Sequence, residues 1–240
     1  WLPDGAFPAA DRGELVLVLD DAGNSLEGFD RFLAFPGPLT IAVLPLLDYS
    51  VQAAAMTAAA GKEIILHQPM HAVNGADPGP GAIGPDHSSD EISARLAENL
   101  ATVPGAIDVN NHMGSLATAD PAVMRSLLAT LNSRDLFFLD SRTSVETVGR
   151  PVSREVGIPF AERSVFLDNQ RSREAILGAV LLALEESQRG EPVVMIGHVT
   201  VPILADVLNE IYPVVVEAGY RFAALSAIVQ PVRMAAGDDP

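Results

Sequence analysis

Short apolar segments that end in polar or charged residues recur along the whole chain. Segments of this kind, without the alternation of a strand that has one face in water, are typical of strands buried on both faces of a parallel sheet. The segments predicted to be strands are residues 15–19, 40–44, 63–66, 106–109, 137–139, 164–167, 192–196 and 220–225.

The segments between these strands have apolar residues at helical spacing and recognisable helix ends. The predicted helices are residues 26–34, 50–60, 92–102, 122–131, 173–188 and 202–218, with a shorter one within 142–158. Alternation of strands and helices predicts right-handed βα units around a parallel sheet or barrel. We favour a closed or partly open barrel over a doubly wound sheet, because polar residues follow strands all along the chain.

The ends of the chain and one internal segment lack these patterns. We expect an irregular arm at residues 1–14, one domain at 15–230 and a tail at 231–240. Residues 69–85 are rich in proline and glycine, and the segment is too long for an ordinary connection between a strand and a helix. We therefore expect it to be mobile and to cover one side of a functional cleft.

The composition narrows the classes of partner. Of the 240 residues, 48% are hydrophobic and 19% are charged, which suits a globular protein with a large core and argues against disorder. The net charge is −16, so attraction to nucleic acid or to anionic lipid is not expected, and a neutral or cationic small molecule or a glycan is the better partner. No apolar run reaches the ~18 residues of a membrane-spanning helix. The composition does not indicate an oligomeric state.

The chain contains no cysteine, which excludes disulfides and thiolate chemistry. Any metal must then be held by His, Asp or Glu side chains. The absence of cysteine is compatible with an oxidising compartment. The chain begins at Trp1 without an initiator methionine or a signal peptide, as expected of a trimmed or processed chain.

Side chains capable of chemistry follow four of the predicted strands. They are Asp20 and Asp21, His67, the polar stretch 110–115, and His198. Because the carboxyl ends of parallel strands meet at one edge of a barrel or sheet, we expect these groups to converge there. The sequence therefore predicts a functional site at this edge.

The Asp20 and Asp21 carboxylates, together with the His67 and His112 imidazoles, suggest a metal site in this set. Adjacent residues of a strand point to opposite sides, so Asp20 and Asp21 could divide the roles of metal ligand and proton acceptor. Alternatively, one of them caps a helix and the other is solvated. His67 and His112 with an Asp form a set that Zn²⁺ accepts while a position stays open for water. A lone buried histidine is more often a hydrogen-bonded core residue, but Asn110 and its polar neighbours are costly to bury beside His112 without partners.

Several further polar residues admit two interpretations. His198 follows Gly197, which would let a substrate approach closely, and suits a general acid near neutral pH, although it could also be a core histidine. Asp140 could orient an imidazole or cap the next segment. His87 is interpreted as a surface residue of the long loop. Asp168 also follows a predicted strand, but no pattern assigns it a role.

Taken together, these segments resemble the divergent polysaccharide deacetylase family, a branch of the NodB-like carbohydrate esterases. The matching stretches are residues 19–23, 61–70, 110–115, 138–141, 165–168 and 196–198. The resemblance implies a distorted (β/α)7-type barrel of the NodB-like polysaccharide deacetylase fold. It also implies a divalent metal, usually Zn²⁺, and hydrolysis of N- or O-acetyl groups on a glycan.

The resemblance also implies roles for individual residues. By similarity, Asp20 is the general base, Asp21 a metal ligand, His67 the metal ligand of the second motif, and His198 the general acid. Asn111, Ser115 and Asp140 would then support the metal or contact the substrate.

The third metal ligand has two candidates. His112 stands where the wider deacetylases carry an arginine-containing motif, and we take it as the third ligand. The usual second motif is His-Ser/Thr-x-x-His, and here Gln68 replaces the hydroxyl residue while His71 keeps the last position. His71 is therefore the alternative third ligand.

Two classes of function follow from this resemblance. The first is a periplasmic or secreted zinc-dependent deacetylase acting on a carbohydrate. The second is a glycan-binding or cell-envelope module that has kept the metal site without turnover.

Overall fold

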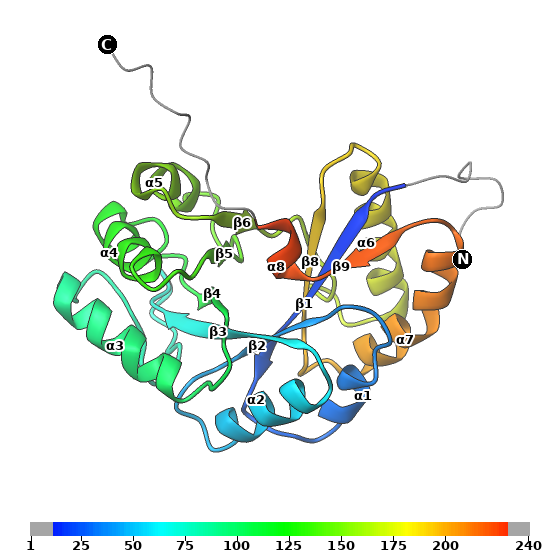
Figure 1. Ribbon diagram of the computed structural model, residues 1–240, viewed down its shortest axis with the longest axis horizontal. Helices are drawn as coiled ribbons and strands as arrows, with labels where there is room; N and C mark the ends of the chain where they lie inside the picture. Colours follow the sequence, from blue (N-terminus) through cyan, green and yellow to red (C-terminus); the bar gives the residue numbers. More distant parts are fainter. Residues whose placement is uncertain (1–11, 230–240) are drawn as a thin grey trace, which may run out of the picture.

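The computed structural model describes residues 12–229, which form one curled sheet of parallel strands with helices around it (Figure 1). The strands are β1 (Glu14–Ala22), β2 (Thr40–Val43), β3 (Glu63–Met70), β4 (Asp108–Met113), β5 (Phe138–Asp140), β6 (Phe160–Glu162), β7 (Val165–Phe166), β8 (Val193–His198) and β9 (Arg221–Ala223). The helices are α1 (Phe29–Leu33), α2 (Ser50–Ala59), α3 (Ser89–Ala101), α4 (Pro121–Asn132), α5 (Gly149–Val156), α6 (Arg173–Ser187), α7 (Pro202–Glu217) and α8 (Leu225–Ile228).

The strand order is β6-β5-β4-β3-β2-β1-β8-β7, and β9 pairs with the start of β1. Helices α1 to α7 surround the outer side of the sheet, whereas α8 lies on its concave side (Figure 1). Every pairing is parallel. This incompletely closed barrel confirms the predicted fold class.

The two ends of the sheet belong to one short piece of chain. β6 pairs with β5, and only Arg163 and Ser164 separate it from β7, which pairs with β8. The Arg163 backbone N–H still donates to Asp140 of β5, whereas that of Ser164 already donates to Val194 of β8. The strand predicted at 164–167 therefore corresponds to β7, and a second short strand, β6, comes just before it. Residues 160–167 therefore pass from one end of the sheet to the other, and we call this segment the seam.

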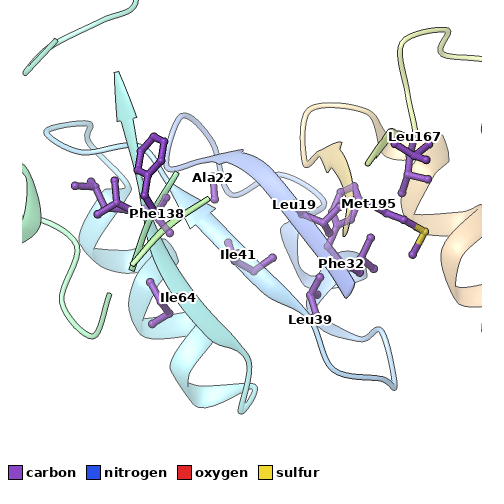
Figure 2. Packing of buried hydrophobic residues seen from close by; sticks show 14 of the residues in the cluster. Leu19, Ala22, Phe32, Leu39, Ile41, Ile64, Phe138, Leu167 and Met195 are labelled. Carbon is purple, nitrogen blue, oxygen red and sulfur yellow. The ribbon is translucent and has the colours of Figure 1, made fainter. Parts of the chain in front are cut away.

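Two apolar cores lie on opposite faces of the sheet. The outer core fills the space between the strands and the helices and includes Leu19 and Met195 (Figure 2). The inner core lies on the concave side and includes Val18, Ile65 and Ile196, with Leu225 of α8 packed among them. Because strand residues alternate between the two faces, the inward positions that follow these three along the chain are Asp20, His67 and His198. The strand pattern itself therefore brings polar groups to the carboxyl end of the barrel interior.

β3 and β4 continue further than the sequence predicts. Their paired register runs from Ile65 and Asp108 to Met70 and Met113, so His67, Asn110 and Asn111 lie within strands and not beyond them. The sequence boundaries were wrong because these polar side chains find partners inside the barrel. β6 and α8 were not predicted, and the strand predicted at 220–225 is divided between β9 and α8.

Parts of the predicted domain division fall outside the described residues. These are residues 1–11 of the arm, residue 230 at the end of the domain and the whole tail at 231–240. Glu14, assigned to the arm from the sequence, is the first residue of β1. No helix within residues 12–229 is both long and apolar enough to cross a membrane.

Candidate metal centre

An irregularity in β1 turns Asp21 towards the barrel interior. Between Leu19 and Ala22 the register with β2 shifts, so β1 contains one extra residue, and Asp21 has a left-handed φ of 68°. We expected Asp20 and Asp21 to point to opposite sides, as in a regular strand. Instead both approach His67 Nε2, at 3.7 Å for Asp20 Oδ2 and 3.3 Å for Asp21 Oδ1. The left-handed backbone of a β-bulge explains why the alternation fails here.

Asp21, His67 and His112 form a compact group of three ligand atoms. Asp21 Oδ1 lies 3.0 Å from His112 Nδ1 and 3.3 Å from His67 Nε2, and the two nitrogens are 3.2 Å apart. Zinc bonds of ~2.0–2.1 Å at tetrahedral angles would separate ligand atoms by roughly 3.3 Å. The spacing of the triangle therefore suits a small divalent cation.

The chemistry of the three donors also suits a cation. Asp21 Oδ1 is buried and accepts no hydrogen bond of good geometry, although two ring nitrogens lie beside it. Burial opposes ionisation of Asp21, but His112 and His67 outweigh it and hold the pKa of the carboxyl well below its usual range. Two imidazole nitrogens and one carboxylate oxygen are also a common set for catalytic zinc, so the residues fit the metal that the family resemblance implies.

Asp20 lies beside this triangle in the barrel interior. Its side chain is nearly fully buried, and Oδ1 accepts a hydrogen bond of 2.8 Å from Asn110 Nδ2. Burial raises the pKa of Asp20, although the nearby charges of His67 and His198 act in the opposite direction. A buried carboxylate with a raised pKa is a proton acceptor closer to neutrality than an exposed one.

His198 lies opposite Asp20 in the register of β1 and β8 and is held by Asp168. Asp168 Oδ1 is 2.9 Å from His198 Nδ1, and Oδ2 accepts the backbone N–H of His198 at 2.8 Å. Burial would lower the pKa of His198, but the hydrogen bond and charge of Asp168 outweigh it and raise the pKa to about 9. The imidazole is therefore protonated at neutral pH, which is the state of a general acid.

Sequence reasoning misread Gly197 and did not recognise Asp168. A Cβ on Gly197 would clash with Leu204 of α7, so this glycine allows close packing of the helix and does not open the site to a substrate. Asp168 follows a predicted strand, as Asp20 does. That position and its place in the matching stretch 165–168 were the signals that could have identified it.

His71 lies outside the triangle. Its Nδ1 is 3.3 Å from Asp86 in the loop that follows β3, and its ring lies near that of His87. Of the two candidates for a third ligand, the structure brings His112 and not His71 to Asp21 and His67. His87 is also less exposed than expected, because its Nδ1 accepts the backbone N–H of Gly84 at 3.1 Å.

Asn111 and Ser115 support the backbone around the site. Asn111 Oδ1 accepts the backbone N–H of Ser141, and its Nδ2 donates to the carbonyl of Met113. Ser115 Oγ accepts the backbone N–H of Val73. Their hydrogen bonds tie the ends of β4 and β5 and the loop after β3 together, and neither residue belongs to the ligand triangle.

Asp140 caps a turn and orients no imidazole. It is buried, and its side chain accepts hydrogen bonds from the backbone of Arg142 at 2.7 Å and from Thr147 Oγ1 at 2.6 Å. This is the second of the two roles that the sequence allowed for it.

Two cavities border the triangle, and both are lined by Asp21 and Asn24. One, of about 200 Å³, is also lined by His112 and by residues 77–80 of the long loop. The other, of about 460 Å³, is lined by Ser25, Glu27, Val199 and Thr200, among others. The long loop thus borders a cavity beside the triangle, as its predicted position over a cleft requires. Its mobility stays a prediction.

Comparison with known proteins establishes the family. The chain matches the divergent polysaccharide deacetylase family over residues 17–229. It is 30% identical over 187 residues to an uncharacterised protein of Haemophilus influenzae and 29% identical over 204 residues to the uncharacterised protein YibQ of Escherichia coli. This chain belongs to the divergent polysaccharide deacetylase family, as its sequence motifs indicated.

These matches cover 78% and 84% of this chain and 67% and 64% of the two relatives. The chain therefore spans only about two thirds of the length of these relatives.

Solved structures show the same fold at low sequence identity. An uncharacterised protein from Agrobacterium tumefaciens C58 superimposes with a TM-score of 0.86 at 18% identity, covering 93% of this chain and 92% of that one. A family 4 carbohydrate esterase from Streptomyces lividans, in complex with acetate, gives 0.55 at 15% identity, covering 93% and 98%. The BA3943 mutant, a CE4 family pseudoenzyme with restored enzymatic activity, gives 0.58 at 15% identity, covering 92% and 68%.

Proposed function

We propose that this protein is a metal-dependent hydrolase that removes N- or O-acetyl groups from a glycan. The observation that carries the proposal is the Asp21, His67 and His112 triangle, with the buried Asp20 carboxylate and the Asp168-bonded His198 imidazole beside it, in a chain of this family. Asp21 Oδ1, His67 Nε2 and His112 Nδ1 would hold the cation, and Zn²⁺ suits this donor set best. When bound, the cation would polarise the acetyl carbonyl and lower the pKa of a water molecule.

Asp20 and His198 would move the protons. Asp20 Oδ1 is held by Asn110, so Oδ2, which points towards His67 Nε2, is the oxygen left to accept a proton from the attacking water. His198 Nδ1 is held by Asp168, so Nε2 is the atom left to protonate the departing nitrogen or oxygen. The water oxygen bonds to the acetyl carbon, the C–N or C–O bond breaks, and acetate leaves the sugar amine or hydroxyl.

The surroundings of the site support a carbohydrate substrate. The two cavities combine hydrogen-bonding groups such as Asn24, Ser25 and Thr200 with apolar groups such as Leu44 and Pro45. Sugars present hydroxyls together with apolar ring faces, and a net charge of −16 does not favour an anionic polymer. We further propose a periplasmic or secreted location, on the strength of the family resemblance.

A glycan-binding module without turnover is the second candidate. The fold is shared with a CE4 family pseudoenzyme as well as with an esterase, and the second motif carries Gln68 where the wider family has a hydroxyl residue. In the structure Gln68 Nε2 donates to the backbone carbonyls of Pro69 and Gly81, so it braces the long loop. Metal content does not separate the two candidates, whereas acetate release does.

The test compares zinc content and acetate release from acetylated glycans in a small set of variants. His198→Ala should retain zinc and fold but lose at least about a hundredfold in rate, because a general acid contributes ~10²–10⁴-fold. Asp20→Asn should behave similarly, and Asp21→Asn should lose zinc as well. His71→Ala is the matched control and should retain both zinc and activity.

Three outcomes would change the proposal. Loss of zinc from His198→Ala would make His198 a ligand. Loss of zinc from His71→Ala would restore His71 as the third ligand. A zinc-loaded wild-type protein that hydrolyses no acetylated glycan or model ester would favour the binding module.

A further inference from the structure

The Asn110 side chain lies between the proposed base and one of the proposed ligands. It is fully buried, Nδ2 is 2.8 Å from Asp20 Oδ1, and Oδ1 is 2.8 Å from His67 Nδ1. We propose that Asn110 is a positioning residue that fixes the ring tautomer of His67 for the cation and the orientation of the Asp20 carboxylate for proton transfer. The inference rests on the function proposed above.

The chemistry of the three groups determines which way the amide points. An ionised carboxylate only accepts hydrogen bonds, so the NH₂ group of Asn110 must face Asp20. The amide oxygen then faces His67 Nδ1, and because an amide oxygen only accepts, Nδ1 must carry the proton. Neutral His67 therefore has its lone pair on Nε2, the atom that lies 3.3 Å from Asp21 Oδ1 and 3.2 Å from His112 Nδ1.

The same amide fixes the Asp20 carboxylate. With Oδ1 bonded to Asn110, Oδ2 is directed to the ligand triangle, 3.7 Å from His67 Nε2. Within residues 12–229, no Lys or Arg forms an ion pair with Asp20. The neutral amide of Asn110 can therefore orient the Asp20 carboxylate without the positive charge by which a nearby Lys or Arg would lower the pKa of that carboxyl.

Asn111 shows what a purely structural amide does at the neighbouring position. It is as buried as Asn110, but both of its hydrogen bonds go to backbone atoms, of Met113 and Ser141. Successive residues of β4 point to opposite faces, so the two amides have different partners. Asn111 therefore supplies a matched control of the same residue type.

The test uses two variants of Asn110 with different consequences. Asn110→Ala removes the hydrogen bonds to Asp20 and His67, together with a longer one of 3.4 Å to Ser141 Oγ. Zinc affinity, measured by competition with a chelator, should therefore fall ~10–100-fold, and acetate release at saturating zinc should fall as well. Asn110→Asp keeps an acceptor for His67 Nδ1 but places a second carboxylate beside Asp20. Zinc affinity should then stay at least as high as in the wild type, while the rate at saturating zinc falls ~10-fold or more. Asn111→Ala should lower the melting temperature and leave zinc affinity within about twofold.

A measurement on the wild-type protein does not depend on the folding of any variant. In ¹⁵N NMR spectra of the zinc-loaded protein, His67 Nδ1 should carry a proton that exchanges slowly with water, because it is buried and bonded to Asn110. An unprotonated Nδ1 would overturn the inference. So would Asn110→Ala with wild-type zinc affinity and rate.

Failure of the proposed function gives a different result. A wild-type protein that binds zinc but releases no acetate would refute the deacetylase activity, whereas the tautomer and the zinc affinities would still test the action of Asn110 on His67.

Discussion

Asp168 controls the charge of His198 through two hydrogen bonds, one to the ring and one to the backbone. Its carboxylate outweighs the effect of burial and raises the pKa of His198 to about 9. Asp168→Asn keeps an acceptor but removes the charge, so the pKa of His198 should fall towards the ordinary value of ~6.5. In a profile of kcat/KM against pH, the alkaline limb should then move down by about 2 pH units. An unmoved limb would mean that another group donates the proton.

Asp108 lies at the opposite, amino end of the barrel interior, where it accepts the backbone N–H of Phe137 at 2.8 Å. Burial, together with the charge of Glu63, raises its pKa to about 8. A carboxyl with a raised pKa stabilises the fold fully below its unfolded pKa of ~3.9, and this contribution is lost as the pH rises through about 8.

Asp108→Asn should therefore raise the free energy of unfolding at pH 8 by up to a few kcal/mol, at roughly 1.4 kcal/mol per pH unit as an upper bound. At pH 4 the variant and the wild type should be nearly equal. Denaturant unfolding at both pH values is the measurement. Equal stability at pH 8 would show that Asp108 ionises in the fold without penalty.

The sequence indicated the side chains of the candidate site, but it did not indicate the residues that hydrogen-bond to them. Asp20, Asp21, His67, His112 and His198 were found because polar residues after apolar runs are visible along the chain. Their partners were not, because whether Asn110 bridges Asp20 to His67 depends on strand register, which a single sequence does not reveal. The left-handed backbone of Asp21 was hidden for a similar reason, since neither glycine nor a turn motif marks it.

Segments with strong local signals were predicted well. Ser88 and Glu91 form a capping box, with 2.8 Å between the Ser88 backbone nitrogen and Glu91 Oε2, and α3 begins at Ser89, three residues before the predicted start. Within the seam, β7 lies in the strand predicted at 164–167, whereas β6 was missed because it is too short to give a pattern and its pairing is decided by β5. Local chemistry therefore fixed the helix ends, whereas long-range pairing decided the shortest strands.

The long loop after β3 is firmly tied at its base. His71 and Ile83 are bonded through their backbones, and Gln68 Nε2 and Asn99 Nδ2 both donate to the carbonyl of Gly81. Residues 77–80 line the smaller cavity, together with Asp21 and His112. These hydrogen bonds make the base of the loop a structural brace. The outer part of the loop contributes lining residues to the smaller cavity.

Shortening this outer part within residues 74–79 should consequently raise KM for an acetylated glycan more than it lowers the melting temperature. Asp77→Ala, which changes a single cavity-lining side chain, is the milder companion variant. A shortened protein that unfolds, or one that folds with unchanged KM, would assign the outer part to the brace as well.

A bound cation would join β1, β3 and β4 and so stabilise the whole barrel. A ligand that binds only the folded protein raises the free energy of unfolding by RT ln(1 + [L]/Kd), where [L] is the free ligand concentration. Saturating zinc should therefore raise the melting temperature. Burial opposes protonation of His67, but Asp20 and Asp21 outweigh it and raise the pKa of the ring, so protons should compete with zinc. The rise in melting temperature should be large at pH 8 and small at pH 5.5. The same rise at both values, or none at pH 8, would contradict binding at these residues.

The extra residue in β1 makes the sheet less regular than it could be. A left-handed φ at a residue with a Cβ costs of the order of 1–2 kcal/mol, and the pairing with β2 shifts at this point. Deletion of Asp21 alone would restore both and remove one ligand. Loss of this single codon would thus remove a candidate metal ligand and the residue with the left-handed backbone together. If catalysis were no longer under selection, this one deletion would both relieve the backbone strain and abolish the candidate metal site.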